Sequence, residues 1–140
     1  MLEVGMAEVD DSILNVTKKI LGLPPEQTAF DLEIITHINS MFTVLEQLGI
    51  GKPGGFFITD NTAKWSEFME GEAINAVKSY MGLRVRLLFD PPATGPATDA
   101  INKQAEMLEW RLHTLMEGVR YEAWLATQPT SSSDTMGSPV

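Results

Sequence analysis

Residues 84–92 read Arg-Val-Arg-Leu-Leu-Phe-Asp-Pro-Pro, and this stretch decides the expected fold. It closes an apolar run that begins near Glu72. The run carries two stripes at helical spacing, namely Ile74, Val77, Met81, Val85 and Leu88, and Ala76, Tyr80, Leu83 and Leu87. A helix that is apolar on two sides usually packs between neighbours on both. Proline lacks a backbone N–H and disfavours helix in the residue before it, so the double proline ends the helix. The stretch therefore predicts a central helix.

Working outward, the sequence predicts an all-α fold, a small bundle of four to five helices. In chain order we expect a short helix after Asp10-Asp11-Ser12 that ends at Gly22, a longer one capped by Thr28 and Asp31 that closes at Gly49, one turn holding Trp65 and Phe68, the central helix to Phe89, and a last helix from about Ala97 to Gly118. No internal repeat is present.

Three segments fall outside this helical pattern. Residues 54–60 combine glycines with an aromatic and β-branched run, which predicts a short strand-like projecting loop. We expect residues 1–9 to be an N-terminal arm, residues 10–118 the helical domain, and residues 119–140 a C-terminal arm. Residues 120–126 of that arm are expected to form either an extra turn or an extended segment. The end of the chain is rich in Ser, Thr, Pro and Gly, so we expect disorder from about residue 128.

Composition limits the possible classes of protein. With 140 residues and 44% hydrophobic content, the chain suits one domain with one core. It has neither a run of about 18 apolar residues nor a secretory signal pattern, so we expect no membrane partner. Without cysteine no disulfide framework is possible. The net charge of −9 argues against tight nucleic-acid binding and is explained either by solubility or by a channel wall that lets DNA slide.

No motif predicts catalysis, a cofactor or a metal site. His37 and His113 fall on different expected helices without a second histidine or a cysteine at helical spacing, so structural roles are favoured for both. The segment Gly51-Lys52-Pro53-Gly54-Gly55 precedes a strand-like run instead of opening a helix, which favours a loop over a phosphate cradle. Carboxylates are numerous, but no spacing singles out an acid–base pair. The sequence predicts a protein that is not an enzyme.

Arg84 and Arg86 are the most informative charges. They are two residues apart, which is about 200° around a helix, so they cannot face the same way. Both can extend to solvent along their apolar stems. Alternatively, at least one pairs with a carboxylate of the last helix or of a neighbouring subunit, because an unpaired buried charge is costly. Glu109 is the expected partner, since it lies beside the apolar stripe of the last helix.

Several aromatic residues lie outside the helical stripes. They are Phe56, Phe57, Trp65, Tyr121 and Trp124. For any one of them, burial in the core remains the more common explanation. As a group they indicate contacts with another chain, because aromatic side chains and arginine are enriched at interface centres.

The order and spacing of several segments resemble the head-tail connector, or adaptor, proteins of tailed bacteriophages. The segments are Asp31, His37-Ile38-Asn39-Ser40, Leu48-Gly49-Ile50-Gly51, residues 84–92 and Leu108-Glu109-Trp110-Arg111, and the resemblance covers roughly residues 31–112. Proteins of that family are helical and form a ring under the portal. The ring extends the DNA channel and joins a stopper or tail-completion protein.

The resemblance implies a structural protein of the virion neck, made in the host cytoplasm. Its partners would be further copies of itself in a ring (a dodecamer), the portal, and a stopper or tail-completion protein, with DNA passing through unbound. Gly118 to the C-terminus would grasp the portal. The candidate contact residues are Phe56, Phe57, Trp65, Arg84, Arg86, Glu109, Trp110, Arg111, Tyr121 and Trp124. The alternative is a small helical protein-binding adaptor or regulator without a ring.

Overall fold

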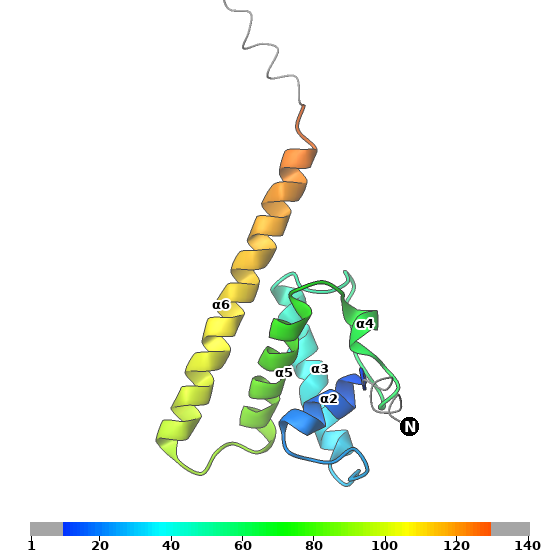
Figure 1. Ribbon diagram of the computed structural model, residues 1–140, viewed down its shortest axis with the longest axis vertical. Helices are drawn as coiled ribbons and strands as arrows, with labels where there is room; N and C mark the ends of the chain where they lie inside the picture. The colour runs from blue at the N-terminus through cyan, green and yellow to red at the C-terminus, as the bar shows by residue number, and fades with distance from the viewer. Residues whose placement is uncertain (1–9, 130–140) are drawn as a thin grey trace, which may run out of the picture.

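The computed structural model describes residues 10–129, and every regular element in that part of the chain is a helix (Figure 1). The helices are α2 (Ile13–Ile20), α3 (Asp31–Gln47), α4 (Trp65–Phe68), α5 (Ile74–Phe89) and α6 (Gly95–Ala126). The predicted all-α bundle is confirmed. The only β-type pairing among residues 10–129 is an isolated bridge between Ser12 and Lys64, which ties the start of α2 to the start of α4.

Helix α5 lies at the centre, in contact with α2, α3 and α6 (Figure 1). Its buried residues Val77, Tyr80, Met81 and Val85 belong to the hydrophobic core, as the two apolar stripes predicted. Gly82 lies on the side of α5 that receives α2. A Cβ atom at Gly82 would fall 2.7 Å from Ile20 Cγ2, so only glycine permits this close approach.

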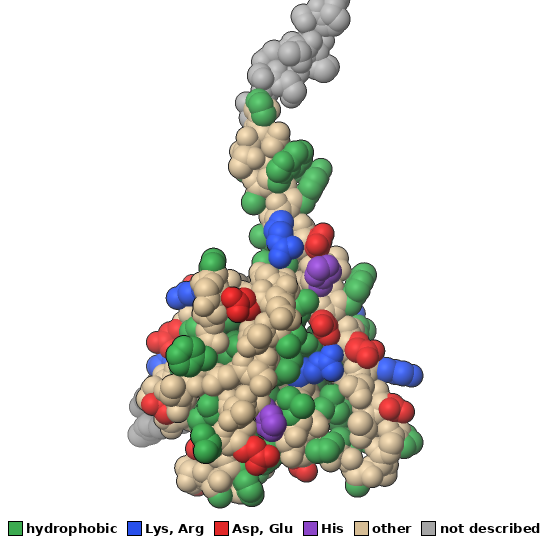
Figure 2. Space-filling model, turned by 180° about the vertical axis from the view of Figure 1, so that it is seen from behind, with side chains coloured by type: hydrophobic (Ala, Val, Ile, Leu, Met, Phe, Trp, Pro, Cys, Tyr) green, Lys and Arg blue, Asp and Glu red, His purple; other side chains and the backbone are tan. Residues whose placement is uncertain are grey.

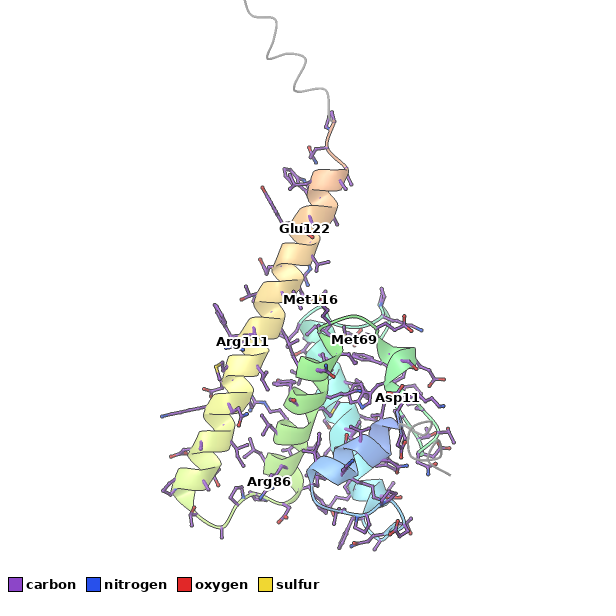
Figure 3. All side chains as sticks on the ribbon, in the orientation of Figure 1. Asp11, Met69, Arg86, Arg111, Met116 and Glu122 are labelled. Atoms are coloured by element: carbon purple, nitrogen blue, oxygen red, sulfur yellow. The ribbon has the colours of Figure 1, made fainter. Side chains whose placement is uncertain are left out.

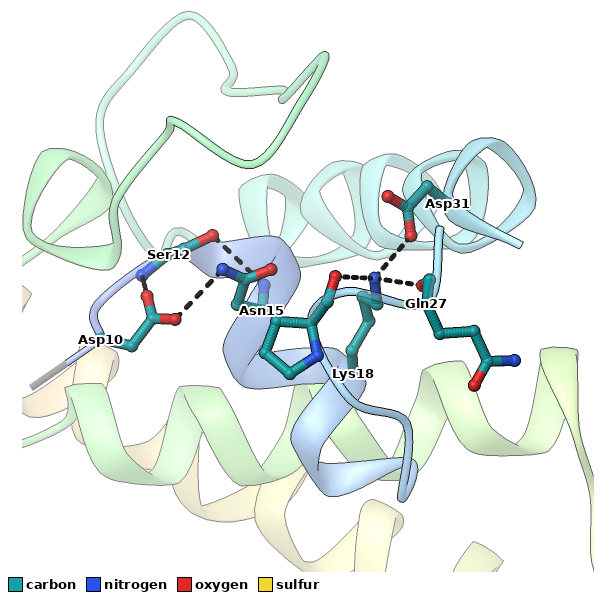
Figure 4. Close-up of polar contacts among 7 residues, drawn as sticks. Asp10, Ser12, Asn15, Lys18, Gln27 and Asp31 are labelled. Carbon is teal, nitrogen blue, oxygen red and sulfur yellow. Dashed lines mark hydrogen bonds and ion pairs between the residues drawn. The ribbon is translucent and has the colours of Figure 1, made fainter. Parts of the chain in front are cut away.

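The connection between α2 and α3 is organised around a buried lysine (Figure 4). The Lys18 side chain is 1% exposed, and its Nζ lies 2.8 Å from Asp31 Oδ1. The same ammonium donates to the carbonyl oxygens of Pro25 (3.0 Å) and Gln27 (2.6 Å). Asp31 therefore does not cap α3 as predicted, and Phe30 at the N-cap position makes no side-chain capping bond. The three N–H donors of one ammonium therefore provide hydrogen bonds to a carboxylate and two carbonyls, which replace the bonds that these acceptors would make to water.

Helix α3 ends at the predicted glycine. Gly49 has φ +84°, its N–H donates to Glu46, and the N–H of Ile50 donates to the Leu45 carbonyl. This left-handed glycine with the bond that spans it is the Schellman ending of a helix. The position is also covered, because a Cβ atom on Gly49 would collide with the guanidinium of Arg120 on α6.

The loop predicted to project is instead held against the bundle. The side-chain amide of Asn39 on α3 donates to the Ile58 carbonyl (2.9 Å), and its oxygen accepts from the Ile58 N–H (2.8 Å). Ile58 is 2% exposed, and the half-buried Phe56 packs on Phe42 with ring centroids 5.1 Å apart. Phe57 is 70% exposed. Fixing Ile58 inward turns its neighbour outward, because successive side chains of an extended segment point to opposite sides.

Helix α6 is longer than predicted at both ends. The Thr94 hydroxyl accepts from the Ala97 N–H (3.3 Å), so the helix begins at Gly95. At its other end it passes through Gly118, because one glycine costs a helix only about 1 kcal/mol and the flanking residues favour helix. Residues 119–126 are its last two turns, which agrees with the extra turn and not with the extended arm that the sequence left as alternatives. The predicted N-terminal arm and most of the predicted disordered tail lie outside the described residues.

Candidate interaction surface

Arg84 is the centre of a polar cluster between α5 and α6. Its Nη2 donates to Glu109 Oε1 at 2.9 Å, which confirms the predicted pair. Its Cζ atom lies 5.5 Å from the centroid of the Tyr80 ring, one turn earlier on α5. The side chains of Arg84 and Glu109 are 23% and 35% exposed, so the pair is half-buried. It joins two helices of one chain.

Electrostatics in this cluster follow from burial and from the pair. Burial by itself lowers the pKa of Arg84. The contacts with Tyr80 and Glu109 raise it by more than burial lowers it, so the net shift is upward. Burial raises the pKa of Tyr80 above its ordinary value, because the phenolate would be poorly solvated. Arg84 acts in the opposite direction on Tyr80, whereas the negative charge of Glu109 adds to the rise.

A groove of about 460 Å³ opens beside this cluster, between α3, α5 and α6. Its lining combines the polar cluster with apolar side chains, among them Met41, Val44, Leu87 and Leu88. Within that lining, Arg84 and Glu109 are joined by one hydrogen bond. The groove therefore offers mainly an apolar surface.

Arg86 points to the other side of α5, as the two-residue spacing predicted. Its side chain is half-buried, and its Nε atom is buried without a hydrogen-bond partner in the described part of the chain. Arg86 is also the basic residue in the last turn of α5, where a positive charge complements the partial negative charge of the helix end. Figure 3 labels it near the lower end of that helix.

Two of the predicted contact aromatics belong to the core of the molecule. Trp65 is 1% exposed, and its ring centroid lies 5.8 Å from that of Phe42 and 6.0 Å from that of Phe68. Phe56 lies 5.3 Å from Phe68 in the same cluster. The expectation that Trp65 forms an exposed contact surface is therefore wrong, and the half-buried Phe56 is largely used within the chain. A single-turn helix shows no periodic pattern, so its burial was not visible in the sequence.

The remaining predicted contact residues are exposed. Phe57 lies on the loop, and Trp110, Arg111, Tyr121 and Trp124 lie on α6. Trp110 is 66% exposed, Tyr121 60% and Trp124 55%. The rings of Tyr121 and Trp124 stack on each other with centroids 6.0 Å apart. Apolar side chains continue along the projecting end of α6 in Figure 2. Large exposed apolar groups of this kind are typical of a binding surface.

The described residues hold no arrangement for metal binding. No group of three or more His, Asp or Glu side chains in residues 10–129 is placed to hold an ion. His37 Nε2 lies 3.9 Å from Glu33 on α3, and His113 Nε2 lies 3.5 Å from Glu117 on α6, so each histidine faces a carboxylate of its own helix. Within residues 10–129, no helix is both long and apolar enough to cross a membrane.

The structure is a small helical protein with large apolar side chains exposed on α6. A family profile described as phage connector protein matches residues 13–119, which is most of the chain and includes α2 to the greater part of α6. The chain therefore belongs to the phage connector protein family, and the resemblance seen in the sequence is confirmed. Comparisons with curated proteins and with solved structures gave no match.

Proposed function

We propose that this protein is a head-tail connector that forms a closed ring under the phage portal, extends the DNA channel, and receives a stopper or tail-completion protein. Membership of the phage connector family over residues 13–119 carries the proposal. The exposed apolar side chains of α6 support the proposal, because the subunits of a ring need a contact surface in addition to the core of the monomer. The protein would act in the neck of the virion after synthesis in the host cytoplasm.

The ring would use a heterologous interface, in which two different patches of each subunit meet and the rotation closes. We assign Trp110 and Arg111, on the outer side of α6, to one of these two patches. Arg84 and Glu109 stabilise the position of α6 on α5 and so present this patch without contacting the neighbour. A twelve-fold ring would match the symmetry expected of the portal.

The acidic balance of the chain fits passage of DNA without binding. The net charge of −9 provides no basic surface for phosphates. A channel wall of this charge would repel the duplex weakly and let it slide. Catalysis has no part in this role.

Imaging by electron microscopy after mixing the protein with its portal tests the proposal. A ring added below the portal is the expected product. Trp110→Ala should reduce ring addition without unfolding the chain, because the Trp110 side chain is 66% exposed. Lys19→Ala, an exposed change on α2, is the control and should leave ring addition unchanged. A protein that never adds a ring, in particles or in reconstitution, would be a helical binding module instead.

A further inference from the structure

The projecting end of α6, residues 117–126, is separated from the rest of the molecule. Met116 is the last α6 residue packed against the core, and every residue from Glu117 to Thr127 is exposed. Figures 1 and 3 show this end standing clear of the other helices, with Met116 and Glu122 labelled in Figure 3. Its contact with the body is the guanidinium of Arg120 beside Gly49.

One side of the projecting end continues an interface that already exists in the chain. Leu112 and Met116 face the core beside α5, and Val119, Ala123 and Ala126 follow them at steps of three and four residues. The side of α6 that packs against α5 therefore continues along the projecting end. Val119 is 48% exposed, because no other element in residues 10–129 covers it there. The chemistry of this side fits another helix.

The opposite side of the projecting end is also apolar, but it carries large side chains. Tyr121, Trp124 and Leu125 are 60%, 55% and 46% exposed. Val119 and Tyr121 are two residues apart, which places them about 200° apart around the helix. A single partner helix cannot cover both sides. Two partners are needed, one for the side with Val and Ala and one for the side with the large side chains.

Resting on the proposed ring, we infer that residues 117–126 of each subunit pack side by side with the same segment of two neighbouring copies, in a closed circle of parallel helices. The side with Val119 and Ala123 receives the large side chains of one neighbour, and the side with Tyr121 fits the other neighbour. Such a contact joins two different surfaces and so repeats around an axis.

Charge at the edge of the two sides supports packing between copies. Arg120 Nη1 lies 3.8 Å from Glu117 Oε2 of its own helix, and both side chains are more than half exposed. In parallel helices packed in this way, the edge that carries Arg120 lies beside the neighbour's edge that carries Glu117. Opposite charges at such flanking positions set partner choice and orientation in helix packing.

Cysteine pairs test the contact directly, because the native chain contains no cysteine. The variant with Val119→Cys and Tyr121→Cys places one thiol on each packing side. The control with Arg120→Cys and Glu122→Cys has the same two-residue spacing but lies on the flanks. The single variant Ala123→Cys tests symmetric pairing. Each is oxidised mildly in the assembly with portal, because a disulfide needs Cα atoms about 4.4–6.8 Å apart.

A second pair, Ala123→Cys with Leu125→Cys, samples the contact one turn further along. We expect one or both packing-side pairs to shift the protein from monomer to a ladder of covalent multimers on a denaturing gel, with the flank pair remaining monomeric. Rings that form without a ladder, or with an equal ladder from the flank pair, would overturn this inference and leave the proposed function intact. Covalent dimers from Ala123→Cys alone would also overturn it. Absence of any ring would overturn both.

Discussion

Replacing Lys18 with methionine should be among the most damaging single changes in this protein. The apolar stem of methionine fills the same space, so the change leaves no cavity and isolates the loss of the ammonium. That loss strands the Asp31 carboxylate and the carbonyls of Pro25 and Gln27, which lie within 3.0 Å of Nζ. Breaking a buried ion pair costs about 3–5 kcal/mol. The Asp31 side chain is 26% exposed and can regain some water, so we expect the lower end, about 3 kcal/mol.

Urea denaturation followed by far-ultraviolet circular dichroism measures this cost. Lys19→Met is the matched control, since Lys19 is exposed, and it should change the free energy of unfolding by less than about 0.5 kcal/mol. The double variant Lys18→Met with Asp31→Asn should be at least as stable as Lys18→Met alone, because it removes the stranded charge. If Lys18→Met costs no more than the control, the cage of acceptors around Lys18 does not hold the α2–α3 connection and the reasoning is wrong.

Three further predictions have defined outcomes. Arg84→Ala should lower the free energy of unfolding by about 1–2 kcal/mol, more than an exposed ion pair and less than a buried one, in the same urea assay; no loss would mean that the pair with α6 is decorative. Tyr80 should ionise above its ordinary pKa, measured by ultraviolet absorbance in Tyr121→Phe, where it is the only tyrosine. Because its pKa is raised in the folded state, its contribution to stability is complete below a pH of about 10 and is lost as pH rises through the folded pKa; ionisation at or below the ordinary value would contradict the burial argument. Gly49→Ala should destabilise by about 1 kcal/mol or more because its φ is +84°. Gly118→Ala should instead stabilise the free protein by about 0.5–1 kcal/mol, since Gly118 lies in a helix with open space around it; effects of equal sign in thermal unfolding would refute this contrast.

Periodic features of the fold could be predicted from the sequence, and contacts made by irregular segments could not. The two stripes of α5 placed it at the centre, and the position of Glu109 beside an apolar stripe identified the partner of Arg84. The cage around Lys18 was missed, because two of its three acceptors are backbone carbonyls and carbonyls have no sequence signature. Because the contact of Asp31 with Lys18 was missed, Asp31 was assigned as a cap of α3.

The interaction surface was predicted in part for similar reasons. Aromatic residues outside a stripe can be buried by a loop or left exposed, and the pattern alone does not distinguish the two. Trp65 and Phe56 are enclosed by neighbours distant in the chain, whereas Tyr121 and Trp124 extend beyond every other element. The continuation of α6 through Gly118 depended on local helix preference outweighing one unfavourable residue.

The two hydrogen bonds between Asn39 and Ile58, one donated and one accepted by the Asn39 side chain, restrict how this loop can vary in length. They fix Ile58 inward, and the residues on either side of it, Phe57 and Thr59, are exposed. Insertion or deletion of a single residue just before Ile58 would exchange Phe57 for another residue on the outside and turn the wrong side chain into the Phe42 cluster. Length variation in this loop is therefore expected at the exposed residues 52–54, away from the anchored residues 56–58.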